Sequence, residues 1–321
     1  MKKHIGTIFK LAVTVAVIAF LINRIGWNSI YSVTVTARPS WLAAGLLLFL
    51  ASSLTGVVQW RLLLSNRKIP LRFGRACKLY LIGMFFNNFI LGGIVGDVLK
   101  IASIRSIDGK GKAGLAATFL DRFAGLWAMC GFAVAGSIVL LMRHGALRTG
   151  QVDTAMIALA GAFLLFAGIL LFLVSRPLQQ LVFSILSRMP LPAKDRIRDT
   201  LAEMLFEAHD IHILLKVAAL STVIQFMRIG VHLLVAQSLG LLTAANFQYF
   251  FIFVPLIAML MTLPLPFGIR EAAGGTLFSL AGFPSDAAYV MGFLASLVGI
   301  AASFIGGLFY VTDRTLTREQ Q

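Results

Sequence analysis

The sequence has little charge and few cysteines for its length. Only 13% of its 321 residues are charged and 59% are hydrophobic, against roughly 25% and about 45–50% in soluble domains. With a mean hydropathy of +0.89, the apolar residues are too many for one core in water, which excludes a soluble enzyme. Cys77 and Cys130 lie in or beside apolar segments without a Cys-x-x-Cys pair or a ligand cluster, so neither a disulfide framework nor a zinc site is expected.

Motifs of common membrane enzymes and pumps are also missing. The sequence has no Walker A loop, no His-Glu-x-x-His, no Gly-x-Ser-x-Gly and no zinc-ligand spacing. ATP-driven transport and the familiar hydrolase mechanisms therefore have no residues to act through. We expect no cofactor and no metal, and a transporter is favoured over an enzyme.

Long apolar segments predict an all-α, polytopic membrane protein. Each is long enough to cross about 30 Å of hydrocarbon as a helix, and the first, which follows three lysines, is predicted to be an uncleaved signal anchor. The six predicted crossings are the apolar stretch that follows Lys10 and continues to about Ile25, and the segments at about 41–64, 115–142, 154–174, 211–239 and 287–311. Two further apolar segments, 79–98 and 247–282, are predicted to be broken, re-entrant helices. The predicted breaks are Gly92, Gly93 and Gly96 in the first and Pro264, Pro266 and Gly268 in the second.

Charge placement orients these segments. If both broken segments enter and leave on the same side, 21 of the 28 basic residues fall on one face. The opposite face then holds four: Arg24, Arg38, Arg143 and Arg148. This satisfies the positive-inside rule and predicts cytoplasmic N- and C-termini in a bacterial inner membrane. Topology and contact with anionic lipid then explain the net charge of +15, and no nucleic-acid partner is expected.

The order of the segments predicts two membrane halves of opposite orientation, 1–150 and 151–321. Each half has two crossings, a broken segment and a third crossing, and the odd number of crossings inverts the second half. Paired interruptions in inverted halves indicate a midplane binding site in a transporter. The stretch 195–211 has one apolar stripe, which predicts a cytoplasmic amphipathic helix, either a linker between the halves or a helix on the membrane surface.

Ionisable side chains inside the membrane are costly and are therefore functional candidates. Asp97 and Lys100 lie one helical turn apart and can pair on one face, the alternative being a simple interfacial cap. The glycine-rich break before them frees backbone N–H groups for an anion. Asp121 and Arg122 point in different directions and need separate partners, and Arg122 could meet either a lipid phosphate or Asp97.

In the second half, Gln225, Arg228 and His232 recur at i, i+3 and i+7, which places them on one helix face. A histidine in this setting is more often a core residue. Arg228 stays charged and needs a carboxylate or a phosphate, which an arginine fork suits well. Glu271 is the internal candidate. We expect Arg228, Arg270 and Glu271 to line one cavity, with a purely structural ion pair as the alternative.

Irregular backbone at membrane depth is tolerated only where protein covers it or where it lines a cavity. The second break precedes Arg270 and Glu271 directly. At the first break, Asn87 and Asn88 are amides that can satisfy freed backbone groups or a lipid headgroup.

The residues around the first break resemble the signature of a known family. They are Gly83-Met-Phe-Phe-Asn-Asn-Phe-Ile-Leu-Gly-Gly-Ile-Val-Gly-Asp-Val-Leu-Lys100, followed by Leu120-Asp-Arg-Phe-Ala-Gly-Leu126. This pattern is similar to that of the lysylphosphatidylglycerol synthase transmembrane-region family, also called the flippase-like domain. Residues 264–271 and the glycine-rich tail after Ala287 resemble the second half of the family, whereas the proline that the family usually has near Leu91 is missing.

The resemblance implies a lipid translocase of the stand-alone type, because no segment fits the cytoplasmic aminoacyltransferase domain of bifunctional relatives. We expect it to move a phosphate-bearing or amino-modified lipid of the phospholipid, hopanoid or polyprenyl-phosphate type between leaflets. Its expected partners are membrane lipids, anionic or phosphate-bearing, and a homo-oligomer or a separate lipid synthase is left open. The alternatives are a scaffold for that synthase or a lipid-modifying transferase, in which Asp97 and Asp121 would supply paired carboxylates.

Overall fold

The computed structural model describes residues 35–89, 94–108, 110–144, 161, 163–164, 167–168, 171, 175–188, 210–260 and 269–312. All regular elements in this part of the chain are α-helices, which confirms the predicted all-α class. Four of them are long and apolar enough to cross a membrane: α3 (Pro39–Asn66), α6 (Gly111–His144), α10 (Ile211–Ser238) and α13 (Ser285–Thr312). They coincide with four of the predicted crossings, whereas 1–25 and nearly all of 154–174 lie outside the described residues.

Each segment predicted to be broken forms two shorter helices. The first gives α4 (Phe73–Phe89) and α5 (Val95–Asp108), and the second gives α11 (Gln248–Leu260) and α12 (Ile269–Leu280). The predicted breaks lie outside the described residues, with one exception. Gly96 was expected in the break but belongs to the first turn of α5, because the helix already begins at Val95, immediately after the break.

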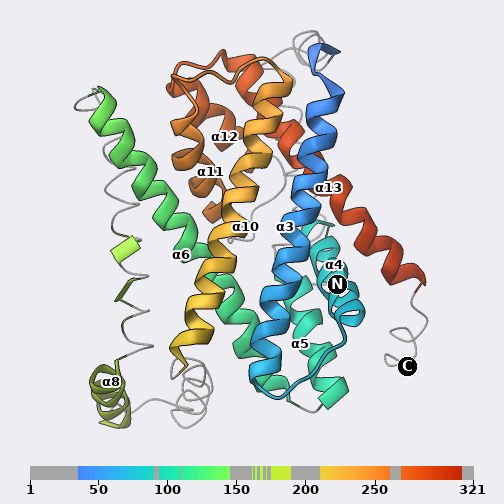
Figure 1. Ribbon diagram of the computed structural model, residues 1–321, viewed down its shortest axis with the longest axis vertical. Coiled ribbons are helices and arrows are strands. Elements are labelled where there is room, and N and C mark those ends of the chain that lie inside the picture. The colour runs from blue at the N-terminus through green and yellow to red at the C-terminus, as the bar shows by residue number, and fades with distance from the viewer. Residues whose placement is uncertain are drawn as a thin grey trace, which may run out of the picture.

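The helices of each pair fold back on one another at opposite ends of the molecule (Figure 1). With 17 and 14 residues, α4 and α5 are about 25 and 21 Å long, short of the roughly 30 Å of a bilayer core. The chain before α4 meets the chain after α5, where Lys110 Nζ donates to the carbonyl oxygen of Lys68 at 3.2 Å. The division into two inverted halves, 1–150 and 151–321, stays a prediction.

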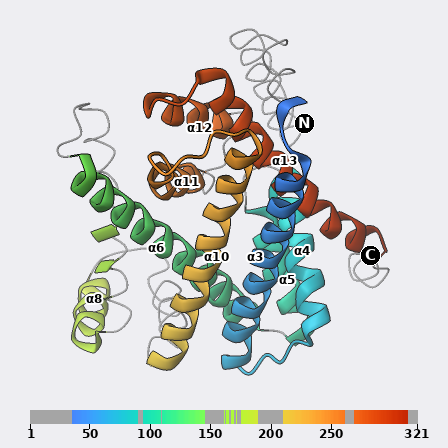
Figure 2. The same cartoon turned by 45° about the horizontal axis from the view of Figure 1, so that its top comes forward.

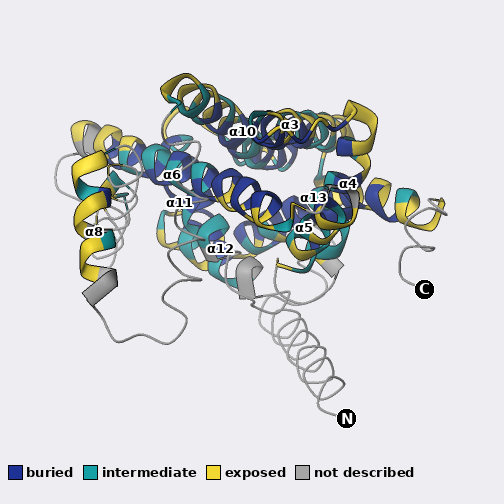
Figure 3. Cartoon of the chain, turned by 90° about the horizontal axis from the view of Figure 1, so that it is seen from below, coloured by how far each residue is buried: buried dark blue, intermediate teal, exposed yellow. Residues whose placement is uncertain are grey.

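The long helices form two layers. Helices α3 and α10 pack side by side along most of their length (Figures 1 and 2). Viewed along the long axis, this pair covers α6 and α13, and buried residues concentrate where the two layers meet (Figure 3). Large apolar side chains on the outer faces, among them Leu47, Met142 and Val311, are exposed, as expected for helices that face lipid.

Close helix crossings around α4 depend on glycine. A Cβ atom on Gly96 would overlap the carbonyl of Gly83 on α4, and one on Gly306 of α13 would overlap the carbonyl of Leu81. Small residues at such crossings let helix backbones approach closely in a membrane. These contacts hold α5 and α13 against α4 and thereby fix the first turn of α5.

A shorter helix, α8 (Arg176–Arg188), was not predicted. It exposes Leu181 and Ile185. The amphipathic helix predicted at 195–211 lies outside the described residues except for its end, where Asp210 caps α10 by accepting hydrogen bonds from the backbone N–H groups of His212 and Ile213 at 3.0 and 3.2 Å.

Candidate functional site

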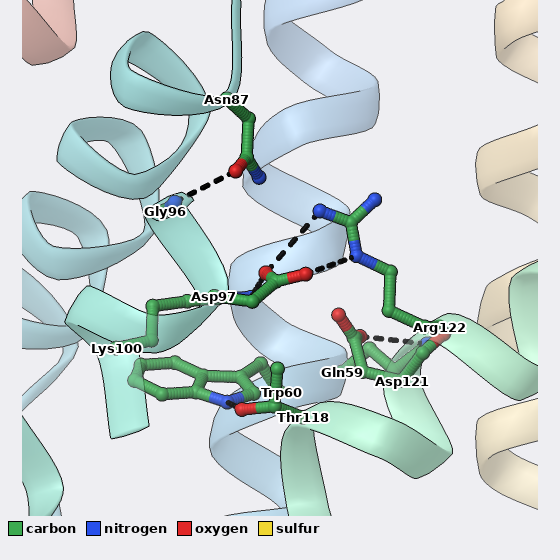
Figure 4. A network of polar contacts seen from close by, with 9 residues as sticks. All are labelled: Gln59, Trp60, Asn87, Gly96, Asp97, Lys100, Thr118, Asp121 and Arg122. Atoms are coloured by element: carbon green, nitrogen blue, oxygen red, sulfur yellow. Dashed lines mark hydrogen bonds and ion pairs between the residues drawn. The ribbon is translucent and has the colours of Figure 1, made fainter. Parts of the chain in front are cut away.

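Asp97 joins two cations from different helices (Figure 4). Arg122 of α6 donates from Nε to Asp97 Oδ2 at 2.8 Å and from Nη2 to Oδ1 at 3.2 Å, and Lys100 Nζ lies 3.0 Å from Oδ1. This confirms the predicted pairing of Asp97 with Lys100. Of the two partners considered for Arg122, the structure shows Asp97. Since the carboxylate of Asp97 links α5 to α6, it does more than cap the start of α5.

Lys100 is held in a buried aromatic environment. Its side chain is 4% exposed, and Nζ lies 5.4 Å from the ring centroid of Trp60 and 4.9 Å from that of Tyr80. Trp60 is itself fixed, because its Nε1 donates to Thr118 Oγ1 at 3.3 Å. A buried ammonium needs a carboxylate, and aromatic faces add cation–π attraction. The buried ammonium of Lys100 therefore balances the charge of Asp97 from within the helix bundle.

Arg122 is the accessible cation of this group. Its side chain is 49% exposed, whereas that of Asp97 is 15% exposed. A guanidinium has five N–H donors, and Asp97 accepts two of them. Arg122 can therefore present further donors to a second anion while it remains attached to Asp97.

The amide next to the first break satisfies a backbone group, as predicted. Asn87 Oδ1 accepts a hydrogen bond from the backbone N–H of Gly96 at 2.7 Å. The first N–H groups of a helix lack intrahelical acceptors, so this contact completes the start of α5. Asn88 is exposed, on the part of α4 that leads into the break.

Gln59 and Ser221 belong to the site but were missed by the sequence analysis. Gln59, which is 1% exposed, donates from Nε2 to Asp121 Oδ1 at 2.9 Å and accepts from Ser221 Oγ at 2.8 Å. This relay joins α3, α6 and α10. A glutamine within the apolar helix 39–66 was a usable signal, because a polar side chain at membrane depth needs a partner.

The predicted polar stripe of α10 faces protein at one end. Gln225 is buried and packs on α6, where a Cβ atom on Gly125 would lie 3.0 Å from its Nε2. His232 Nδ1 lies 3.0 Å from the carbonyl oxygen of Arg228, and a carbonyl only accepts, so Nδ1 carries the proton. Within the described part of the chain, Arg228 Nε is buried without a hydrogen-bond partner.

The structure only partly covers the second predicted group. The backbone of Arg270 and Glu271 forms the first turn of α12, but their side chains lie outside the description, as do Pro264, Pro266 and Gly268. The cavity expected between Arg228, Arg270 and Glu271 therefore stays a prediction. Among the described residues, no group of three or more His, Cys, Asp and Glu side chains could hold a metal ion.

Comparison with known protein families gave a match over most of the chain. The sequence model of a family described as "Lysylphosphatidylglycerol synthase TM region" matches residues 7–314 and so includes every residue of the site. No curated protein and no solved structure matches the chain.

Proposed function

Because the chain belongs to the lysylphosphatidylglycerol synthase TM region family, a multi-pass membrane family with a lipid-related function, we propose that it moves a lipid between the two leaflets. The cargo carries a phosphate or an amino-modified headgroup, on a phospholipid, a hopanoid or a polyprenyl-phosphate carrier. The headgroup passes along the polar side chains of the helices while the tails stay in the bilayer.

The observation that carries this proposal is the half-exposed side chain of Arg122 on a membrane-crossing helix. An embedded charge is costly and therefore marks a substrate pathway in many membrane proteins, and the arginine fork matches the geometry of phosphate. A phosphate can accept the guanidinium donors of Arg122 that do not bind Asp97, while Lys100 remains paired with Asp97 at 3.0 Å. The pair of Arg122 and Asp97 is therefore suited to bind and release a headgroup repeatedly.

Other polar residues extend the path on either side of Arg122. Asn88 is exposed beside the first break. Arg228 on α10 is close enough to Arg122 for their charges to interact, and we propose that Arg270 and Glu271 continue the path at the second break. In this proposal the predicted face with 21 of the 28 basic residues is cytoplasmic, with both termini on that side of a bacterial inner membrane.

Exchange in liposomes tests the proposal. Purified protein is reconstituted with a trace of phosphatidylglycerol labelled on its acyl chain with a fluorophore that external dithionite bleaches. In vesicles with wild-type protein, dithionite is expected to bleach label that started in the inner leaflet, whereas empty vesicles protect that label from bleaching. Arg122→Ala is expected to lower the exchange rate at least about tenfold, because charge-assisted hydrogen bonds contribute about 1.5–3 kcal/mol. Arg122→Lys, which keeps the charge without the fork, is expected to lie between the two.

The matched control is Arg105→Ala, which removes an exposed arginine from α5 outside the site. Its exchange rate is expected to equal that of wild type. Exchange no faster than in empty vesicles, or equal exchange in wild type and Arg122→Ala, would refute the proposal. Turnover of the headgroup in detergent without exchange would instead favour the lipid-modifying transferase.

A further inference from the structure

We infer that Asp121 determines which headgroup charge the site accepts. It holds the net charge of a group of five described ionisable side chains around Arg122 at +1, so the site favours a lipid headgroup with one net negative charge over a zwitterionic or a dianionic one. This inference rests on the proposed function, since it names the class of lipid that the same site would move.

Five ionisable side chains form one group, called the charged cluster: Asp97, Lys100, Asp121, Arg122 and Arg228. Asp97 contacts Lys100 and Arg122 directly. Asp121 is close enough to interact electrostatically with Lys100, Arg122 and Asp97, and Arg228 with Arg122 and Asp121. Three cations and two carboxylates in their ionised forms give the cluster one unbalanced positive charge.

The remaining ionisable candidates do not change this sum. Arg270 and Glu271 carry opposite charges, so their inclusion adds nothing. His232 is left out of the sum, as histidine is in the formal charge of the chain, and its Nδ1–H donates to the backbone carbonyl oxygen of Arg228. The net charge of +1 therefore holds whether or not the second break contributes to the path.

The two carboxylates of the cluster have different tasks. Asp97 is occupied by two cations at 2.8 and 3.0 Å. Asp121 is 8% exposed, and within the described residues its side chain makes no ion pair but accepts from the neutral amide of Gln59 at 2.9 Å. Replacing Asp121 would thus alter the charge of the site without breaking an ion pair.

Packing places Asp121 near both arginines that can meet a headgroup. Arg122 is its neighbour in sequence. Ser221 lies level with Asp121 through Gln59 and Gln225 lies level with Gly125. Arg228 follows one turn further along the same face of α10 and is still close enough to interact electrostatically with Asp121. The hydrogen bond from Ser221 holds Gln59, and hence Asp121, between these helices. The negative charge of Asp121 therefore offsets part of the attraction that Arg122 and Arg228 exert on an anion.

Asp121→Asn tests the inference, because it removes the charge and keeps an oxygen that can accept the hydrogen bond from Gln59. Exchange is measured at pH 8 with three acyl-labelled lipids: phosphatidylcholine, phosphatidylglycerol and phosphatidic acid, which approaches a charge of about −2. Wild type is expected to prefer phosphatidylglycerol over the other two. In Asp121→Asn the ratio of phosphatidic acid to phosphatidylglycerol exchange is expected to rise about tenfold, as one added charge several ångströms away implies.

Two variants separate charge from structure. Asp286→Asn makes the same charge change at an exposed position in the first turn of α13 and is expected to leave the ratio unaltered. Gln59→Glu combined with Asp121→Asn restores the net charge and the hydrogen bond with donor and acceptor exchanged, and is expected to return the ratio to that of wild type. If the double variant folds but keeps the exchange ratio of Asp121→Asn, the negative charge must be on α6.

The outcomes distinguish this inference from the proposed function. Absence of exchange in wild type defeats the proposed function. Exchange without preference among the three lipids, or an equal ratio in wild type and Asp121→Asn, defeats the inference alone. If Asp121→Asn elutes as aggregate in size-exclusion chromatography, Arg228→Gln replaces it. That variant lowers the net charge to zero and is expected to shift exchange toward phosphatidylcholine, and an unshifted ratio would overturn the inference.

Discussion

Removing the amide of Gln59 should loosen the contact of three helices at once. In Gln59→Leu the side chain keeps its approximate volume and loses both hydrogen-bonding ends. Asp121 then loses its donor at 2.9 Å and Ser221 loses its acceptor at 2.8 Å. Because Gln59 and Ser221 are each 1% exposed, water cannot take over the lost contacts.

The expected cost follows from the kinds of hydrogen bond involved. A hydrogen bond to a charged group contributes about 1.5–3 kcal/mol and a neutral one about 1 kcal/mol. Interhelical hydrogen bonds in membrane proteins average about 0.6 kcal/mol, because the unfolded chain also finds partners. We expect Gln59→Leu to lower the free energy of unfolding by about 2–3 kcal/mol. At about 2 °C per kcal/mol for a large domain, the midpoint should fall by roughly 4–6 °C.

Thermal unfolding in detergent micelles, followed by intrinsic tryptophan fluorescence, measures this change. The matched control is Thr55→Val, one turn earlier on α3, whose hydroxyl donates within the helix to the carbonyl oxygen of Ala51 at 2.9 Å. Its midpoint should change by less than about 1 °C, because the hydrogen bond that is lost lies within one helix and Thr55 is only partly buried. A midpoint for Gln59→Leu within 1 °C of that for Thr55→Val would refute the claim that Gln59 joins the helices.

Two further predictions concern packing and topology. Gly96→Ala should lower the free energy of unfolding by about 3 kcal/mol or more, because the added Cβ atom would overlap the Gly83 carbonyl. The control Gly74→Ala has open space around it and should not destabilise α4. Equal unfolding midpoints for the two variants would contradict the close crossing of α4 and α5. Topology is tested in a chain with Cys77 and Cys130 replaced by alanine. There, Lys110→Cys should react with an impermeant maleimide only from the cytoplasmic side, and Arg38→Cys only from the other side. Labelling of Lys110→Cys from the periplasm alone would overturn the re-entrant assignment of α4 and α5.

Local patterns allowed part of the site to be predicted. Asp97 and Lys100 lie three residues apart, so a helix alone brings them together, and the structure confirms the pair. The glycine-rich stretch indicated a break, although Gly96 proved to be helical. Predictions that depend on the side chains of Arg270 and Glu271 stay open, because these lie outside the described residues.

By itself the sequence determined the membrane environment, the helical class and the four long apolar helices in the described part of the chain. These properties follow from composition and from runs of neighbouring residues, since a long apolar segment that crosses a bilayer must satisfy its own backbone hydrogen bonds, as a helix does. Tertiary structure decided which partners the embedded polar groups take. Gln59 meets Asp121 across 62 residues and Ser221 meets Gln59 across 162. Such contacts depend on how the helices cross and rotate against one another, which no local pattern records, and they decide the balance of charge around Arg122.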